Sequence, residues 1–196
     1  MTSQPSNPTL LHTQLPDALF AQYTTESTYK LAAADKLEIT EKLYLLELIF
    51  DTRRYEIMDA ILTEDFVMDH ALAKRLDRAS FKQLWQDNEA ALLNGIRHQL
   101  TNVIVYADND DTATAIAYLN VLKFANTSTL SRTDNPILLA HAVQVVQFRK
   151  EKDVWKLAHL TIDQMAVSEI FGLDQVTGHY FAALANERDQ LRQPLF

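Results

Sequence analysis

Gly95-Ile96-Arg97-His98-Gln99-Leu100-Thr101-Asn102-Val103-Ile104-Val105-Tyr106 is the stretch that best indicates the fold of this chain. Its polar and apolar residues alternate as in a strand, and one face is predicted to carry His98, Leu100, Asn102 and Ile104. That face places an imidazole and a carboxamide among apolar side chains. Burial of such groups costs a few kcal/mol unless each finds a hydrogen-bond partner. The face therefore either holds a satisfied internal network or lines a pocket.

The sequence before this strand predicts helices. Asp35 followed by Glu38 is typical of a capping box, and the absence of Gly and Pro predicts a helix that runs to about Phe50. Its apolar stripe is expected to contain Ile39, Leu43, Leu46 and Phe50, with a second line beside it formed by Leu37, Tyr44, Leu48 and Asp51. Asp51 is the one carboxylate on that line. A purely structural explanation is that Asp51 or Thr52 caps a second helix, predicted at 53–62.

Further elements complete an α+β pattern. A short strand at 66–71 contains Asp69-His70, and a third helix is expected from Ser80 to Asn94-Gly95. Strands are predicted at 112–124, 137–149 and 154–162, and a terminal helix at 169–192. This order predicts a curved, mostly antiparallel sheet with helices on one face. We expect an N-terminal arm at 1–34 that is able to pack on a neighbour, one domain at 35–168, and a C-terminal helix at 169–196.

Composition narrows the partners and the compartment. The 196 residues are 47% hydrophobic and carry a net charge of −8, which disfavours nucleic acid and anionic lipid as partners. No apolar run approaches the ~20 residues that a membrane span needs. The chain has no cysteine, and its first basic residue is Lys30, so a cytoplasmic location without a signal peptide is the simplest expectation.

The chemistry that the sequence supports is that of a carboxylate paired with an imidazole. The six histidines show no metal-binding spacing, the three glycines form no phosphate loop, and no serine lies in a nucleophile elbow. We therefore expect neither a metal nor an organic cofactor. Asp51, Asp69, His70 and His98 are all predicted at the ends or inner faces of elements around one cavity. A carboxylate that orients a histidine makes an acid/base group for enolisation, dehydration or cyclisation. A buried histidine bonded to a backbone carbonyl is the alternative for His98.

Several motifs together resemble a known family. They are Phe50-Asp51-Thr52-Arg53-Arg54-Tyr55, the strand ending in Asp69, Arg97-His98-Gln99-Leu100-Thr101-Asn102, Thr112-Ala113-Thr114-Ala115 and Val154-Trp155-Lys156-Leu157-Ala158. In order and spacing they resemble the SnoaL-like branch of the NTF2-like superfamily over roughly residues 36–168. The resemblance implies a cone-shaped α+β barrel whose helices cover the concave face, with a deep apolar pocket.

Within that superfamily the chain is most similar to scytalone dehydratases, and this resemblance implies roles for single residues. The catalytic carboxylate of that pattern falls on Asp51 and its first pocket histidine on His98. A pocket tyrosine falls on His70, a second histidine near Lys123 and a pocket asparagine near Gln144. Phe50 replaces a tyrosine before the carboxylate, although Tyr44 lies two turns earlier on the line of Asp51 and could reach the same cavity. With Asp69 and Asn102, these residues form the expected substrate site.

The resemblance predicts a cofactor-independent lyase or isomerase acting on a small apolar or aromatic molecule. The alternative is a non-catalytic pocket protein or assembly subunit of the same fold. A homo-oligomer, dimer or trimer, is expected through the sheet face that carries Thr114, Ile116, Tyr118 and Asn120. Phe171 is the predicted cover of the pocket mouth, and a terminal helix that simply packs on the barrel is the competing expectation.

Overall fold

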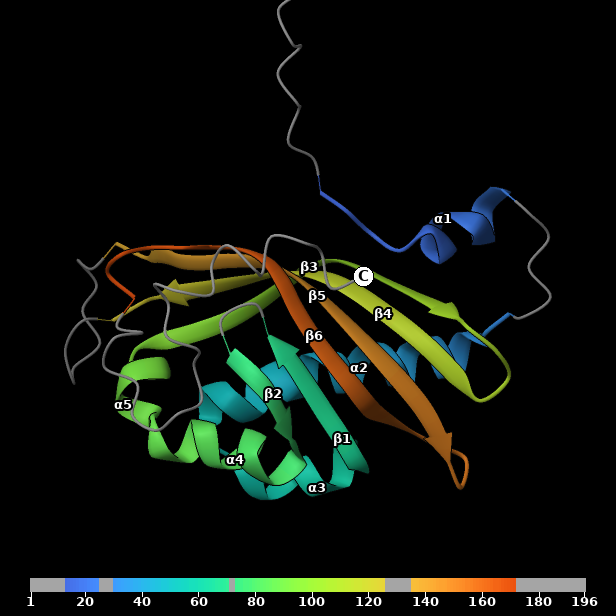
Figure 1. Cartoon of the computed structure of the whole chain (residues 1–196), viewed down its shortest axis with the longest axis horizontal. Coiled ribbons are helices and arrows are strands. Elements are labelled where there is room, and N and C mark those ends of the chain that lie inside the picture. The colour runs from blue at the N-terminus through green and yellow to red at the C-terminus, as the bar shows by residue number, and fades with distance from the viewer. Residues whose placement is uncertain (1–12, 25–29, 71–72, 126–134, 172–196) are drawn as a thin grey trace, which may run out of the picture.

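In the computed structural model, one curved and open sheet of six strands lies against a layer of helices (Figure 1). The structure describes residues 13–24, 30–70, 73–125 and 135–171. The strand order is β2-β1-β6-β5-β4-β3. Only the β1–β6 pair is parallel among these strands, so the sheet is mostly antiparallel as predicted. The predicted α+β class is confirmed.

The first helix of the helical layer, α2 (Ala33–Thr52), contributes the apolar stripe predicted from the sequence. Ile39, Leu43, Leu46 and Phe50 are all buried against the sheet. The predicted capping box is wrong, because α2 begins without a side-chain cap. Asp35 and Glu38 bind Trp155 at the far end of the sheet instead: Asp35 accepts from its indole N–H at 2.8 Å, and Glu38 from its backbone N–H at 3.1 Å.

The second line of α2 faces solvent rather than the core, except at Asp51. Leu37, Tyr44 and Leu48 are 60%, 43% and 55% exposed, so apolar side chains at this spacing did not mark a buried face. The helix ends at Arg53, which adopts a left-handed conformation with φ 59°. The predicted helix at 53–62 is therefore replaced by the short turns η1 (Tyr55–Ile57) and α3 (Met58–Ile61), followed at Leu62 by a strand.

The strands β1 (Leu62–His70) and β2 (Ala73–Asp77) form an antiparallel pair at one edge of the sheet. Asp77 caps the next helix, α4 (Arg78–Asp87), by accepting from the backbone N–H of Ser80 at 2.8 Å. The short α5 (Glu89–Leu92) follows. Gly95 then has φ 68°, and a Cβ at this position would lie 2.2 Å from the carbonyl oxygen of Ala125. Only glycine fits this connection into the next strand.

The strand from which the fold was predicted is β3 (Ile96–Ala107), and it contains an irregularity that the sequence did not signal. Its pairing with β4 (Thr112–Lys123) shifts register between Thr101 and Ile104, and Asn102 has φ 53°. Because a bulge of this kind inserts a residue, the two faces exchange beyond it. His98 and Leu100 point inward as predicted, whereas Asn102 and Ile104 are exposed and Val105 is buried.

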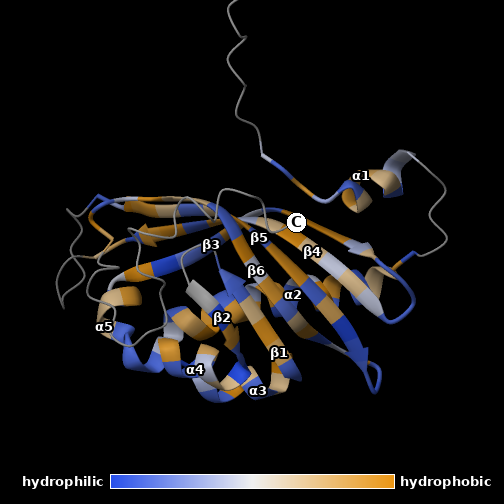
Figure 2. Cartoon of the chain, viewed as in Figure 1, coloured by the Kyte–Doolittle hydropathy of each residue, from blue (hydrophilic) through white to orange (hydrophobic). Residues whose placement is uncertain are grey.

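The long strands β5 (Ile137–Glu151) and β6 (Val154–Val167) form a hairpin that extends beyond the predicted limits. Their inward residues complete one large core with α2 and α4, including Val146, Phe148, Trp155, Leu157 and Leu160. Figure 2 shows this segregation, with hydrophobic residues along α2 and the strands and hydrophilic residues at the turn between β5 and β6. No helix among the described residues is long and apolar enough to span a membrane.

The opposite face of the sheet carries a small second core. Tyr106, Ile116, Val143 and Val145 are buried there by Leu19 of α1 (Asp17–Thr24), which lies across this face (Figure 1). Gln14 and Gln164 fix the segment by exchanging two hydrogen bonds of 2.9 and 2.8 Å. Part of the expected N-terminal arm thus packs on its own sheet. We call this surface the outer face and the helix-covered surface the inner face.

Candidate active site

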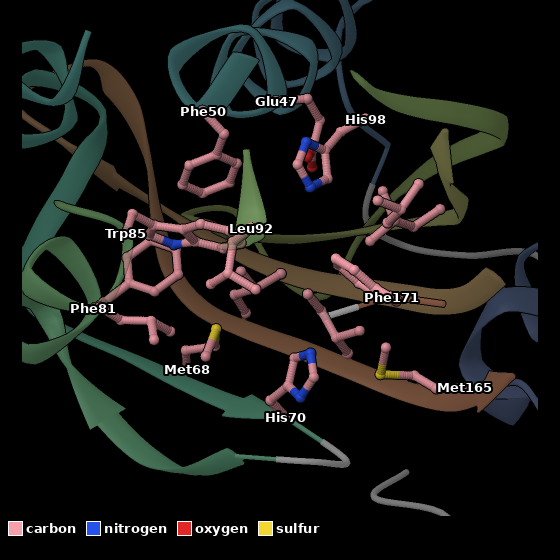
Figure 3. A pocket seen from close by; sticks show the side chains of 15 residues that line it. Glu47, Phe50, Met68, His70, Phe81, Trp85, Leu92, His98, Met165 and Phe171 are labelled. Atoms are coloured by element: carbon pink, nitrogen blue, oxygen red, sulfur yellow. The ribbon is translucent and has the colours of Figure 1, made fainter. Parts of the chain in front are cut away.

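A largely apolar pocket lies between the inner face of the sheet and the helices (Figure 3). Most of its wall is aliphatic, aromatic or thioether: Phe50, Met68, Phe81, Leu84, Trp85, Leu92, Leu119, Val121, Leu160, Ile162, Met165 and Phe171. Three titratable side chains interrupt this wall, namely Glu47, His70 and His98. A few polar groups converging in an apolar pocket are the usual composition of a small-molecule site.

His98 and Asp51 form a hydrogen-bonded pair at the edge of this pocket. Nδ1 of His98 lies 2.9 Å from Oδ1 of Asp51, and the backbone N–H of His98 donates to both carboxylate oxygens at 3.1 and 3.2 Å. The His98 side chain is 5% exposed and that of Asp51 is 13% exposed. Asp51 stands behind the ring and is not part of the pocket lining, so it fixes the ring while His98 meets the cavity.

Two aromatic rings hold the imidazole in place. The His98 ring centroid lies 5.8 Å from that of Phe50 and 6.0 Å from that of Trp85, both edge-on. Phe50 and Trp85 in turn pack on each other at 4.3 Å. Since Nδ1 is held by Asp51, Nε2 is the ring nitrogen left for chemistry in the pocket. Trp85 also has a buried Nε1 without a hydrogen-bond partner among the described residues, and a ligand oxygen would satisfy it.

Glu47 is a second acidic side chain of the site. It lies one turn before Asp51 on α2, is 5% exposed, and accepts a hydrogen bond of 3.0 Å from Nε2 of Gln144 on β5. Burial raises the pKa of the Glu47 carboxyl and the nearby Asp51 adds to this, while His98 and Gln144 oppose it. Sequence reasoning missed Glu47, although its place between Leu43 and Phe50 on the buried stripe was a usable signal.

Two more predicted residues line the pocket. His70 comes from the end of β1, and burial lowers the pKa of its imidazole to about 4, so the ring is neutral near pH 7. Phe171 lies beyond β6 and reaches the lining from the last described turn. The remainder of the expected terminal helix, residues 172–196, lies outside the described residues.

The other predicted site residues lie elsewhere. Tyr44 is on the solvent side of α2 and Asn102 is exposed at the bulge, so neither lines the pocket. Lys123 ends β4 opposite Ile96, away from the lining. Gln144 is 1% exposed and takes part only through its bond to Glu47. Asp69 points to the outer face, because neighbouring residues of a strand face opposite sides of the sheet.

On the outer face Asp69 belongs to a second carboxylate–imidazole pair. Nε2 of His159 lies 2.7 Å from Oδ2 of Asp69, and Arg75 donates to the same oxygen at 2.9 Å. His159 lines a second pocket with polar neighbours that include Thr114, Gln147 and Thr161. Within the described ranges, no cluster of three or more His, Cys, Asp or Glu side chains is arranged to hold a metal ion.

The protein is therefore of the α+β class: helices cover one face of an open sheet, and a pocket lies between them. The chain belongs to the SnoaL-like domain family, whose model matches residues 32–161, more than half of the sequence. No curated protein sequence matches the chain.

Solved structures place the fold among NTF2-like proteins. A protein of unknown function with a cystatin-like fold from Nostoc punctiforme PCC 73102 is 25% identical, with 74% of this chain and 99% of that chain covered and a TM-score of 0.59. An NTF2-like protein with a cystatin-like fold from Novosphingobium aromaticivorans is 19% identical, with 82% and 90% covered and a TM-score of 0.57. A candidate scytalone dehydratase from N. aromaticivorans DSM 12444 is 12% identical, with 70% and 89% covered and a TM-score of 0.54. At these identities the likeness establishes the fold, and the expected NTF2-like architecture is confirmed.

Proposed function

We propose that this protein is a cofactor-independent lyase or isomerase that acts on a small, largely apolar hydroxy-ketone. His98 is the base that removes a carbon-bound proton, and Asp51 orients its ring. The observation that carries this proposal is the 2.9 Å contact between Asp51 and His98 at the wall of an apolar pocket. The SnoaL-like family and the structural likeness to a candidate scytalone dehydratase support the same class of chemistry.

Each part of the pair has a separate task. Asp51 accepts a hydrogen bond from Nδ1–H of His98, which leaves the lone pair of Nε2 available as a base. When His98 takes a proton, the positive charge on the ring is stabilised by the adjacent carboxylate. The apolar walls keep the local dielectric well below that of bulk water, which strengthens this interaction. A positioned base of this kind contributes roughly 10²–10⁴-fold to a rate.

A substrate panel tests the proposal. Aromatic and polyketide-like hydroxy-ketones would be assayed for water loss, ring closure or double-bond migration with the wild-type protein, His98→Ala and Asp51→Asn. We expect turnover of at least one panel member by the wild type and a large loss in both variants. Binding without turnover, unchanged by His98→Ala, would instead support a non-catalytic pocket protein.

Two further proposals accompany this function, one on the oligomeric state of the protein and one on the segment that covers the pocket. We propose a homo-oligomer, dimer or trimer, built on the part of the outer face beyond α1, where Tyr118 and Asn120 are only half-buried. A monomeric mass in light scattering at micromolar concentration would contradict it.

Phe171 in the lining supports a cover role for the segment after β6. Truncation after Ser168 should then weaken ligand binding while the protein stays folded; a collapse of the melting temperature would favour a structural helix.

A further inference from the structure

The pocket contains an acidic side chain, Glu47, that has no role in the proton transfer proposed for His98 and Asp51. Glu47 projects from α2 into the pocket wall close to His98 (Figure 3). It lies about 6 Å along the helix axis from Asp51, since the two are one turn apart. Gln144, buried on β5, holds one of its oxygens at 3.0 Å and thereby fixes the carboxyl group against the sheet.

The two carboxyl groups of α2 have different surroundings. Asp51 accepts three hydrogen bonds from His98 and is partly open to solvent, which stabilises a negative charge. Glu47 has one neutral amide donor, an apolar wall and the charge of Asp51 nearby. Two carboxylates around one imidazole cannot both ionise cheaply, so the proton stays on the more buried one. The other titratable group of the pocket, His70, is neutral and supplies no compensating charge.

We propose that Glu47 is a second catalytic residue, the acid that protonates the departing hydroxyl of a β-hydroxy-ketone while His98 removes the α proton. This inference rests on the proposed function and narrows it to an elimination of water. An isomerase can use one base for both proton transfers, whereas an elimination in which the C–H and C–O bonds break in the same step needs one group to take a proton and another to give one. The pocket offers both groups on neighbouring parts of its wall.

The step balances without a co-reactant. Nε2 of His98 takes the proton on the carbon next to the carbonyl, and the electron pair of that C–H bond forms the carbon–carbon double bond. The C–O bond to the hydroxyl breaks, and the Glu47 proton joins the leaving oxygen to give water. His98 ends protonated and Glu47 ionised, a pair of opposite charges whose attraction favours this state. Proton return from His98 to Glu47 resets the site.

The first test needs no substrate. We would record the infrared difference spectrum between the wild type and Glu47→Gln at neutral pH. It should contain a C=O stretch of a protonated carboxylic acid that comes from the wild type and is missing in the variant. A spectrum with a carboxylate band in its place would overturn the inference. Glu47→Gln keeps the size and polarity of the side chain, so its melting temperature should stay close to that of the wild type.

The second test uses leaving groups. Glu47→Gln should lower kcat about 100-fold or more on a β-hydroxy-ketone with little change in KM, because the variant binds but cannot give a proton. On the matched β-acetoxy-ketone, whose acetate departs without a proton, the same variant should approach the wild type. An equal loss on both substrates, or no loss on the hydroxy-ketone, would overturn the role.

The outcomes separate the inference from the proposed function. Loss of turnover in His98→Ala together with full activity of Glu47→Gln would leave the function standing and remove the inference. A wild type that turns over no panel member would contradict the function, and the acid role would be contradicted with it. The expected result is that the β-acetoxy-ketone restores turnover by Glu47→Gln, whereas His98→Ala stays inactive on it.

Discussion

Among the described residues two carboxylate–imidazole pairs lie on opposite faces of the sheet, and their comparison shows how surroundings decide what the same two residue types can do. Asp51 and His98 meet at 2.9 Å with side chains 13% and 5% exposed, between aromatic rings and an apolar pocket. Asp69 and His159 meet at 2.7 Å with side chains 24% and 27% exposed, and Arg75 shares the carboxylate. Distance alone would rank the outer pair first.

The difference lies in charge and water. The Asp69 carboxylate already has a cation in Arg75, and solvent screens the whole cluster. Among the described residues Asp51 has no Lys or Arg partner and accepts hydrogen bonds from His98 alone, so a proton gained by that ring is stabilised by an undivided negative charge. These surroundings of the inner pair support the proposed proton transfer, whereas the outer pair joins β1 to β6.

The largest expected effect is on catalysis. Replacing His98 with Ala should lower turnover of an identified substrate by roughly 10²–10⁴-fold, because it removes the positioned base. The matched variant His159→Ala removes the same group from the outer face and should leave turnover within about twofold of the wild type. Steady-state kinetics of the two variants side by side measures this. Equal losses would show that the two faces are not functionally distinct.

The second effect is on stability. Asp51→Ala should lower the free energy of unfolding by about 2–3 kcal/mol. The substitution leaves the buried backbone N–H and ring Nδ1 of His98 without the hydrogen-bond acceptor that the carboxylate provides. Asp69→Ala should cost less than about 1 kcal/mol, since its partners are solvated. Urea unfolding followed by circular dichroism gives both values. The comparison fails if the outer substitution proves the more damaging one.

The third effect concerns pH and uses His70, the inward neighbour of Asp69. Its folded pKa of about 4 lies below the ordinary value of 6.5, so the unfolded state binds more protons between these values. The associated stability is fully present above about pH 6.5 and is lost as the pH falls toward 4. Between about pH 7 and pH 5 this amounts to at most about 2 kcal/mol.

His70→Gln should therefore flatten the fall in melting temperature between pH 7 and pH 5. His159→Gln, a matched change on the outer face, should leave the slope of the wild type in place. Thermal unfolding at a series of pH values at constant ionic strength measures both. A His70→Gln protein with the wild-type slope would mean that the imidazole is hydrated in the folded state.

The smallest effect is the response of the outer pair to salt. Raising the salt concentration from about 0.05 M to about 0.5 M should reduce the stabilisation by Asp69 by a few tenths of a kcal/mol, since exposed charges are screened. The readout is the difference in melting temperature between the wild type and Asp69→Asn at the two concentrations. A salt-independent difference would indicate that the outer cluster is less hydrated than its exposure implies.

Much of this architecture was readable from the sequence, because hydrophobic periodicity reports the faces of regular elements. The stripe Ile39, Leu43, Leu46 and Phe50 is buried as predicted, and His98 lies beside Asp51. The spacing of motifs resembling a SnoaL-like domain added the pairing of a helix end with a distant strand. Local patterns contain no information on such long-range contacts.

The errors have identifiable physical causes. The bulge at Asn102 exchanges the faces of β3, and no glycine marks it in the sequence. Asp69 and His70 were both expected at one cavity, yet adjacent residues of a strand must face opposite ways. Glu47 was overlooked because the buried stripe was traced through its apolar members only, and a carboxyl inside such a stripe is the more informative residue.

The two tryptophans have a practical consequence through their different positions. Trp85 lines the pocket beside Phe50 and His98, while Trp155 is fully buried at the other end of α2 with its indole bound to Asp35. With Trp155 replaced by Phe, the tryptophan emission of the protein would come from a single indole, that of Trp85 at the wall of the cavity. Binding of a molecule in the pocket would then quench or shift the fluorescence of Trp85. Ligands could be found in this way without a label and before any reaction has been identified.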